Sequence, residues 1–147
     1  MPDYPPLLPA GFQDVALSDF DRIFVEPFSD QSVRRDLVSR FRQFITLLQN
    51  IGISGTAWID GSFVTQKPSP GDIDLVLLVE QTVLGNLAPK HLNEFNSLIN
   101  NKRETRLRFM CDLYFCDPAS QDWRSYWRGW FGFARSEEVK GIARLSI

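Results

Sequence analysis

The clearest periodic pattern lies between residues 29 and 52, where apolar side chains recur every three or four positions. This spacing places them on one side of an α-helix. Ser29 and Asp30 are suitable N-terminal capping residues, and Gly52 is a typical residue to follow a helix. The apolar positions are Val33, Leu37, Phe41, Phe44, Ile45, Leu48 and Ile51, and the arginines expected on the wetter side are Arg34, Arg35, Arg40 and Arg42. The pattern predicts a long amphipathic helix.

Two segments have the pattern of strands. Residues 72–80 have a continuously aliphatic centre, which is typical of a strand that is covered on both faces. Residues 106–116 predict a second strong strand. A shorter strand is expected at residues 56–59, and imperfect alternation predicts a closing strand within residues 138–147.

Two further helices are predicted at residues 89–101 and 122–133. The resulting order of elements describes an α/β fold, a mixed sheet with packed helices. Residues 1–28 contain several prolines and no sustained period, so they are expected to form an extended N-terminal arm. Residues 29–147 are expected to form one domain.

Composition supports a single folded unit. The chain has 147 residues, of which 44% are hydrophobic and 23% charged, so it is neither disordered nor of low complexity. Its 16 basic and 18 acidic side chains give a formal charge of -2. No global positive field attracts the chain to DNA or to an anionic membrane, so any contact with nucleic acid must be a local patch.

The sequence also bears on location. The longest aliphatic run, residues 75–79, is far shorter than the roughly 20 residues that cross a bilayer. The first residues lack the basic start and apolar stretch of a secretory signal, so we expect a cytoplasmic protein. Cys111 and Cys116 lie five positions apart in a predicted strand and point to opposite faces, so reduced thiols are expected.

Three carboxylates carry the candidate chemistry. Asp72 and Asp74 lie two positions apart in a predicted strand and so share a face, and Asp112 stands among apolar neighbours in another strand. Like charges a few ångströms apart raise each other's pKa unless a cation neutralises them. Hard oxygen ligands of this kind suit Mg²⁺ or Mn²⁺. If the two strands are neighbours, the three carboxylates form the ligand set of two-metal phosphoryl chemistry.

A Gly-Ser turn precedes this strand. Gly61 and Ser62 offer backbone N–H groups and a hydroxyl to a phosphate, and Gly61 has no Cβ to block its approach. Thr65 and Lys67 lie in the loop that follows, where a hydroxyl and an ammonium are available to phosphate. Solvated loop residues are an equally good interpretation of these two, and Asp72 with Asp74 also fits an Asx turn at a strand end.

The segment from residue 58 to residue 116 resembles the nucleotidyltransferase superfamily typified by DNA polymerase beta, kanamycin nucleotidyltransferase and the minimal nucleotidyltransferases. The resemblance rests on Gly61-Ser62, nine further residues, Asp72-Ile73-Asp74 in an apolar strand, and Asp112 in a later strand. Residues 60–75, the proline-containing start and Lys140-Gly141-Ile142 resemble, more closely, a family of small bacterial nucleotidyltransferase-like proteins.

The resemblance implies specific roles. Gly61 and Ser62 would grip a nucleoside triphosphate such as ATP, Asp72 and Asp74 would bind both metals, and Asp112 would complete the site that activates the acceptor hydroxyl. Asp60 departs from the superfamily, where the residue before the glycine is usually apolar. It either caps the following turn or repels phosphate. Larger relatives hold the base and the acceptor with an extra helical domain, whereas only 30 residues follow Asp117 here. We therefore expect substrate selection to come from a partner protein, self-association or the flanking arms.

The leading expectation is therefore an Mg²⁺-dependent transfer of a nucleoside monophosphate from a nucleoside triphosphate to a hydroxyl on a protein or RNA. One alternative is a catalytically silent binding module of the same fold, such as an antitoxin or a subunit of a defence complex. Another is a modifier of small molecules that resembles aminoglycoside nucleotidyltransferases.

Two other features leave alternatives open. Lys102, Arg103, Arg106 and Arg108 form a basic cluster that would steer a nucleotide or RNA, although a solvated helix end is favoured. Trp123, Trp127 and Trp130 recur at helical spacing among arginines, which favours core packing over a partner interface or base stacking. The one histidine, His91, is expected on a helix surface.

Overall fold

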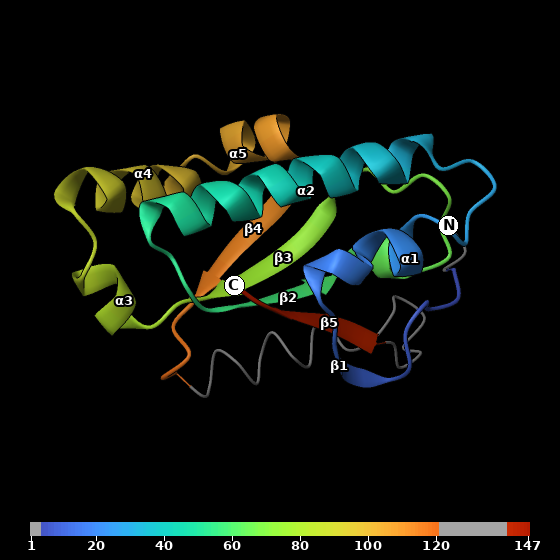
Figure 1. Ribbon diagram of the computed structural model, residues 1–147, viewed down its shortest axis with the longest axis horizontal. Coiled ribbons are helices and arrows are strands. Elements are labelled where there is room, and N and C mark those ends of the chain that lie inside the picture. The colour runs from blue at the N-terminus through green and yellow to red at the C-terminus, as the bar shows by residue number, and fades with distance from the viewer. Residues whose placement is uncertain (1–3, 121–140) are drawn as a thin grey trace.

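The framework of the fold is a five-stranded mixed sheet with the strand order β1-β5-β2-β3-β4 (Figure 1). A computed structural model describes residues 4–120 and 141–147. β3 runs parallel to β4 and β1 runs parallel to β5, whereas β2 is antiparallel to both β3 and β5. The strands are β1 (Gly11–Asp14), β2 (Thr56–Asp60), β3 (Ile73–Leu78), β4 (Cys111–Cys116) and β5 (Gly141–Ser146). The predicted mixed sheet with packed helices is confirmed.

One long helix, α2, runs along the sheet with α4 and α5 beside it (Figure 1). The helices are α1 (Phe20–Phe24), α2 (Ser32–Ile51), α3 (Gln81–Gly85), α4 (Pro89–Asn100) and α5 (Lys102–Phe109). The helices predicted at residues 29–52 and 89–101 are confirmed, and Gly52 in the left-handed conformation follows α2 as expected. The helix predicted at residues 122–133 lies outside the described residues.

The sheet has two buried faces. Ile73, Leu75 and Leu77 of β3 pack in the core that contains the apolar side of α2. Val76 and Leu78 alternate with them and belong to a second apolar cluster on the opposite face. A strand covered on both faces was predicted here from its aliphatic run, and burial on both faces confirms it. Asp74 shares the face of Val76, opposite α2.

The beginning of the chain differs from the expected extended arm. Residues 11–14 form β1, which pairs with β5 at the other end of the sequence. Phe20 and Phe24 of α1 are fully buried and contact the rings of Phe41 and Phe63. These elements could not be recognised in the sequence for two reasons. The segment contains several prolines, and the residues that its elements contact are distant along the chain. Only the stretch near Pro6 lies extended, bridged to Thr65.

The strand predicted at residues 106–116 is wrong over its first five residues. Residues 106–109 belong to α5, and β4 begins only at Cys111. Alternation of polar and apolar residues suggested a strand, but Phe109 packs on Phe44 of α2 and leaves Leu107 67% exposed. Met110, with φ of 54°, ends the helix in the left-handed conformation.

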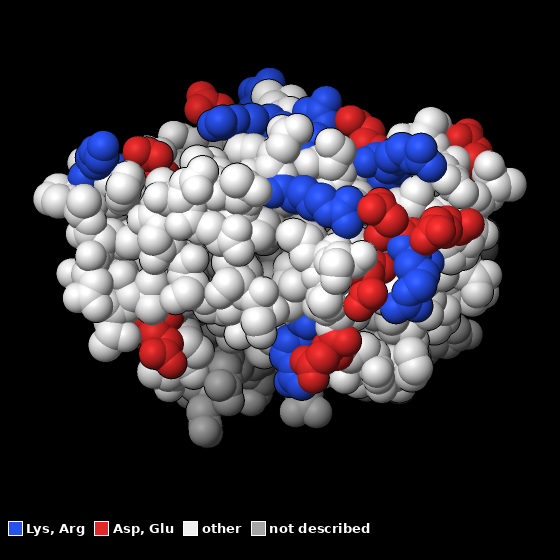
Figure 2. All heavy atoms as spheres, in the orientation of Figure 1, with Lys and Arg blue, Asp and Glu red and all other residues white. Residues whose placement is uncertain are grey.

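The two cysteines are free and buried, as predicted. Cys111 faces the α2 side and Cys116 the other face, so they belong to different apolar clusters. In the described part of the chain, each helix falls short of the length and apolar character needed to cross a bilayer. On the face drawn in Figure 2, acidic and basic side chains are intermixed, consistent with the near-balanced charge of the sequence.

Candidate metal centre

The sheet register brings acidic residues of three strands into one row. Asp74 of β3 is the register partner of Asp112 on β4 and of Asp60 on β2. Residues directly opposite each other in a sheet point to the same face, with Cβ atoms about 5 Å apart. The row therefore lies on the face opposite α2. The predicted convergence of Asp74 and Asp112 from neighbouring strands is confirmed.

Asp72 completes a cluster of three carboxylates. It lies just before β3, and one carboxylate oxygen from each of Asp72, Asp74 and Asp112 lies within 4.8 Å of the other two. All three side chains are partly exposed, whereas Asp60 is buried. We call Asp72, Asp74 and Asp112 the triad. Oxygen atoms gathered in this way are the ligands that Mg²⁺ and Mn²⁺ prefer.

Two cations of α5 contact the triad. Arg106 Nε lies 3.1 Å from Asp72 Oδ2, and Lys102 Nζ lies 3.5 Å from Asp112 Oδ1. Lys102 also lies over the ring of Tyr114. Both side chains are also substantially exposed, and Arg106 lies in the last turn of α5, as the interpretation as a solvated helix end expected. Arg103 and Arg108 are exposed on the same helix.

Two groups next to the triad, the Cys111 thiol and the Tyr114 hydroxyl, are held in their neutral form. Burial, with the added repulsion of the triad, raises the pKa of the Cys111 thiol well above its usual range, which excludes this cysteine as a nucleophile at neutral pH. Burial and Asp112 also raise the pKa of Tyr114. The Tyr114 hydroxyl therefore keeps its proton and donates a hydrogen bond to Asp112 Oδ2 at 3.1 Å.

Gly61 permits the close approach of Asp74. Its φ is +76°, and a Cβ added at this position would lie 1.9 Å from Asp74 Oδ2. From the sequence, we expected that Gly61 leaves room for a phosphate to approach. In the structure, its missing side chain makes room for the carboxylate of Asp74. Asp60 precedes the 3₁₀ turn Gly61–Val64, and its side chain does not cap that turn.

We predict that Gly61→Ala destabilises the protein by about 1–3 kcal/mol, because the new Cβ requires both strained backbone and displacement of Asp74. Chemical denaturation measures this loss. Gly71→Ala is the matched control, since no atom lies within 4 Å of its added Cβ. Equal free energies of unfolding for the two variants would contradict the prediction.

Arg34 holds the loop that follows Gly61. Its guanidinium is fully buried and donates hydrogen bonds to the carbonyls of Phe24, Phe63, Thr65 and Lys67 at 2.7–3.0 Å. Burial lowers the pKa of Arg34 to about 10, so it remains charged at neutral pH. The sequence placed this arginine on the wetter side of its helix, which is wrong. The charge is buried because several backbone carbonyls of one loop surround it.

The remaining predicted phosphate ligands lie in this loop. Ser62 is partly exposed next to Gly61, and its carbonyl accepts hydrogen bonds from the backbone N–H and the hydroxyl of Thr65. Thr65 is buried, and its hydroxyl also accepts the Lys67 N–H, so this side chain shapes the loop. Lys67 is partly buried and lies near enough to Asp72 to lower the pKa of that carboxyl.

The net effect of the surroundings on Asp72 is a raised pKa. Burial is the largest cause and raises the pKa of Asp72. The positive charge of Arg106 lowers this pKa, the negative charge of Asp112 raises it, and the positive charge of Lys67 lowers it. The charged form of Asp72 is therefore less favourable in the folded protein than in the unfolded chain. The contribution of Asp72 to stability is present below the pKa of the unfolded chain and is lost as the pH rises through the raised value.

We expect Asp72→Asn to raise the melting temperature of the metal-free protein at pH 7 by about 1–4 °C, because it removes a carboxylate whose charge is unfavourable there. The gain should shrink as the pH falls toward 3.5. Thermal unfolding in the presence of a chelator measures it. A gain that is independent of pH, or a loss at pH 7, would show that burial does not dominate the energetics of Asp72.

A protein-family model matches residues 2–146, and it is described as a family of unknown function, DUF6932. The chain belongs to this family. A search of curated proteins and a search of solved structures each found no significant match. The family match spans β1 to β5 and therefore includes the whole of the triad and the loop that Arg34 holds.

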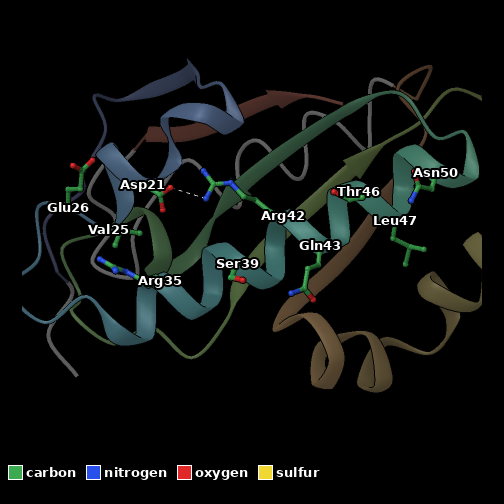
Figure 3. Close-up of a pocket in the computed structure, with 10 residues that line it drawn as sticks. All are labelled: Asp21, Val25, Glu26, Arg35, Ser39, Arg42, Gln43, Thr46, Leu47 and Asn50. Carbon is green, nitrogen blue, oxygen red and sulfur yellow. Dashed lines mark hydrogen bonds and ion pairs between the residues drawn. The ribbon is translucent and has the colours of Figure 1, made fainter.

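A separate groove lies on the α2 side of this DUF6932 chain (Figure 3). Outward-facing residues of α2, including Arg35 and Arg42, line it together with Asp21, Val25 and Glu26. Arg42 reaches across to Asp21 with an ion pair of 2.9 Å. Because α2 and the triad lie on opposite faces of the sheet, this groove is not part of the candidate metal centre.

Three contributors to the site were not predicted from the sequence, although two of them had a signal there. Tyr114 lies two positions after Asp112 in a strand, so it had to share the face of that carboxylate. Arg34 precedes Leu37 and Val38 of the buried stripe by three and four positions, which places it on the buried side of α2. The contact of Arg106 with Asp72 had no signal, because residues 106–109 of α5 were predicted as part of a strand.

Proposed function

We propose that this chain is an Mg²⁺-dependent nucleotidyltransferase that moves a nucleoside monophosphate from a nucleoside triphosphate to a hydroxyl on a protein or RNA. The observation that carries the proposal is the convergence of Asp72, Asp74 and Asp112 from two parallel strands and the loop before one of them. Three carboxylates at one sheet face are costly for a fold unless cations compensate them. The resemblance of residues 58–116 to nucleotidyltransferases supplies the reaction class.

The donor set fits a divalent cation. Asp72, Asp74 and Asp112 provide only oxygen ligands, each with an oxygen within 4.8 Å of the others, and partial exposure leaves a path for the ion. Divalent metal in such a site lowers the pKa of a hydroxyl nucleophile and neutralises phosphate charge. Asp72 and Asp74 would hold both ions, and Asp112 would complete the ion on the acceptor side.

The residues of the chain position the reactants. Gly61 lies beside Asp74 and Ser62 follows it. Both are proposed to bind the triphosphate through backbone N–H groups, in a loop whose carbonyls accept hydrogen bonds from Arg34. The acceptor oxygen forms a bond to the α-phosphorus, and the bond from this phosphorus to the oxygen of the leaving pyrophosphate breaks. The hydroxyl proton is lost to solvent.

The position of the triad favours a large acceptor. The side chains of Asp72 and Asp112 are 18% and 29% exposed at the N-terminal ends of β3 and β4. In the described part of the chain these carboxylates are partly open to solvent, which suits a hydroxyl carried on a macromolecule. We therefore propose a protein or an RNA as the acceptor, with a partner protein or a second copy of the chain as a further contributor to its selection.

Pyrophosphate release from each of the four ribonucleoside triphosphates tests the proposal. The purified protein with Mg²⁺ should release pyrophosphate with at least one of them in the presence of a cell extract as the source of acceptor. A variant with both Asp72→Ala and Asp74→Ala should not. Equal release by the two proteins would overturn the proposal, and release by neither would favour a silent binding module.

A further inference from the structure

Two basic side chains of α5 lie one helical turn apart and contact opposite ends of the triad. Lys102 pairs with Asp112 and Arg106 pairs with Asp72, at 3.5 and 3.1 Å. Positions i and i+4 of a helix lie on the same side, so both cations point to one place. The helix is anchored independently, because Thr105 and Phe109 on its neighbouring side are buried and Phe109 packs on α2.

Both ion pairs are easily exchanged. The side chains of Lys102 and Arg106 are 45% and 58% exposed, and exposed ion pairs contribute about 0–1 kcal/mol to stability. A structural role in holding α5 is therefore a weak explanation for them. A guanidinium has five N–H donors and an ammonium three, more than these single carboxylate contacts use. The unused donors are suited to phosphate oxygens.

We propose that Lys102 and Arg106 bind the phosphates of the triphosphate and that they exchange between the triad and the substrate. This inference rests on the proposed function and names the residues that recognise its donor substrate. A divalent cation and these side chains compete for the carboxylates of Asp72 and Asp112. When metal occupies the triad, the two cations are released toward the adjacent phosphates.

The exchange predicts opposite effects on two affinities. When Arg106 or Lys102 is replaced by a neutral residue, one positive charge that competes with the metal for the triad is removed. One side chain that binds the phosphates of the substrate is removed as well. Arg106→Gln and Lys102→Gln should therefore each bind Mn²⁺ about threefold to tenfold more tightly in the absence of phosphate. They should bind Mg²⁺-tripolyphosphate about tenfold more weakly. A residue that only stabilises α5 would not move the two affinities in opposite directions.

Isothermal titration calorimetry with Mn²⁺ alone, and with inorganic tripolyphosphate in the presence of Mg²⁺, measures both affinities. Tripolyphosphate is used because it carries no base. Arg103→Gln is the matched control, since the adjacent position lies on a different side of the same exposed helix. Arg106→Lys keeps the charge and should recover part of the tripolyphosphate affinity. Melting temperatures establish that each variant is folded.

The outcomes separate the inference from the proposed function. If the unaltered protein binds both ligands and the two variants behave like Arg103→Gln, the exchange is wrong and the nucleotidyltransferase proposal stands. If the affinities shift as expected but no triphosphate yields pyrophosphate, phosphate binding stands and catalysis is wrong. If the unaltered protein binds neither Mn²⁺ nor tripolyphosphate, both proposals fall.

Discussion

Asp74→Asn should lower the rate of pyrophosphate release at least about a thousandfold. Asp74 lies at the centre of the acidic row, between Asp60 and Asp112 in the sheet register. An amide keeps the shape of the side chain but lacks the charge that binds a divalent cation. Loss of metal from a phosphoryl-transfer site removes several kcal/mol of transition-state stabilisation, and each 1.36 kcal/mol is a factor of ten in rate.

The control for this variant is Asp36→Asn. Asp36 is an exposed acid of α2, on the side of the sheet opposite the triad, and it pairs with Arg40 of the same helix. Its rate should match that of the unaltered protein in the same pyrophosphate assay. If Asp74→Asn released pyrophosphate at the rate of the unaltered protein, the triad would be excluded from catalysis.

Arg34→Met should lower the free energy of unfolding by about 3–5 kcal/mol. The methionine fills part of the space but donates no hydrogen bonds, so the carbonyls of Phe63, Thr65 and Lys67 lose their partner inside the protein. These carbonyls belong to the loop between Gly61 and the triad. The same variant should therefore bind Mg²⁺-tripolyphosphate more weakly, which calorimetry measures.

Urea denaturation of Arg34→Met and Arg35→Met tests the structural part of this prediction. Arg35 is the next residue of α2 and is exposed, so its loss should change stability by less than about 0.5 kcal/mol. Arg34→Lys should fall between the two, because an ammonium retains the charge with fewer donors. Equal losses for the two methionine variants would contradict the assigned role of Arg34.

The geometry of the triad could be predicted because it depends on short-range rules. Side chains two positions apart in an extended chain share a face, which joined Asp72 to Asp74. The aliphatic runs around Asp74 and Asp112 identified two strands of one sheet. The sequence did not show that the two strands are neighbours, so this had to be assumed. The parallel pairing of β3 with β4 confirms the assumption.

The sequence of α5 contains two conflicting local signals, and the prediction followed the wrong one. Residues 106–109 alternate between arginine and apolar side chains, as in a half-buried strand. The lysine, arginine, glutamate and leucine residues of this segment are nevertheless strong helix formers. In the folded protein the helix continues to Phe109, which packs against Phe44 of α2. The error had a functional consequence, since only a helix places Lys102 and Arg106 together at the triad.

The beginning of the chain was missed for a related reason. β1 pairs with β5, whose register partners are about 130 residues further along the chain, and no local pattern reports such a partner. Phe20 and Phe24 do have helical spacing, but the segment is too short and too close to prolines to stand out. Residues 11–24 thus supply an edge strand and part of the core, where the sequence predicted an extended arm.

The most direct test of the account is anomalous diffraction from crystals soaked with Mn²⁺ and a non-hydrolysable nucleoside triphosphate. We expect anomalous peaks about 2.1 Å from carboxylate oxygens of Asp72, Asp74 and Asp112, with Lys102 and Arg106 turned toward the phosphates. Carboxylates that remain paired with Lys102 and Arg106, with no Mn²⁺ between them, would contradict the account.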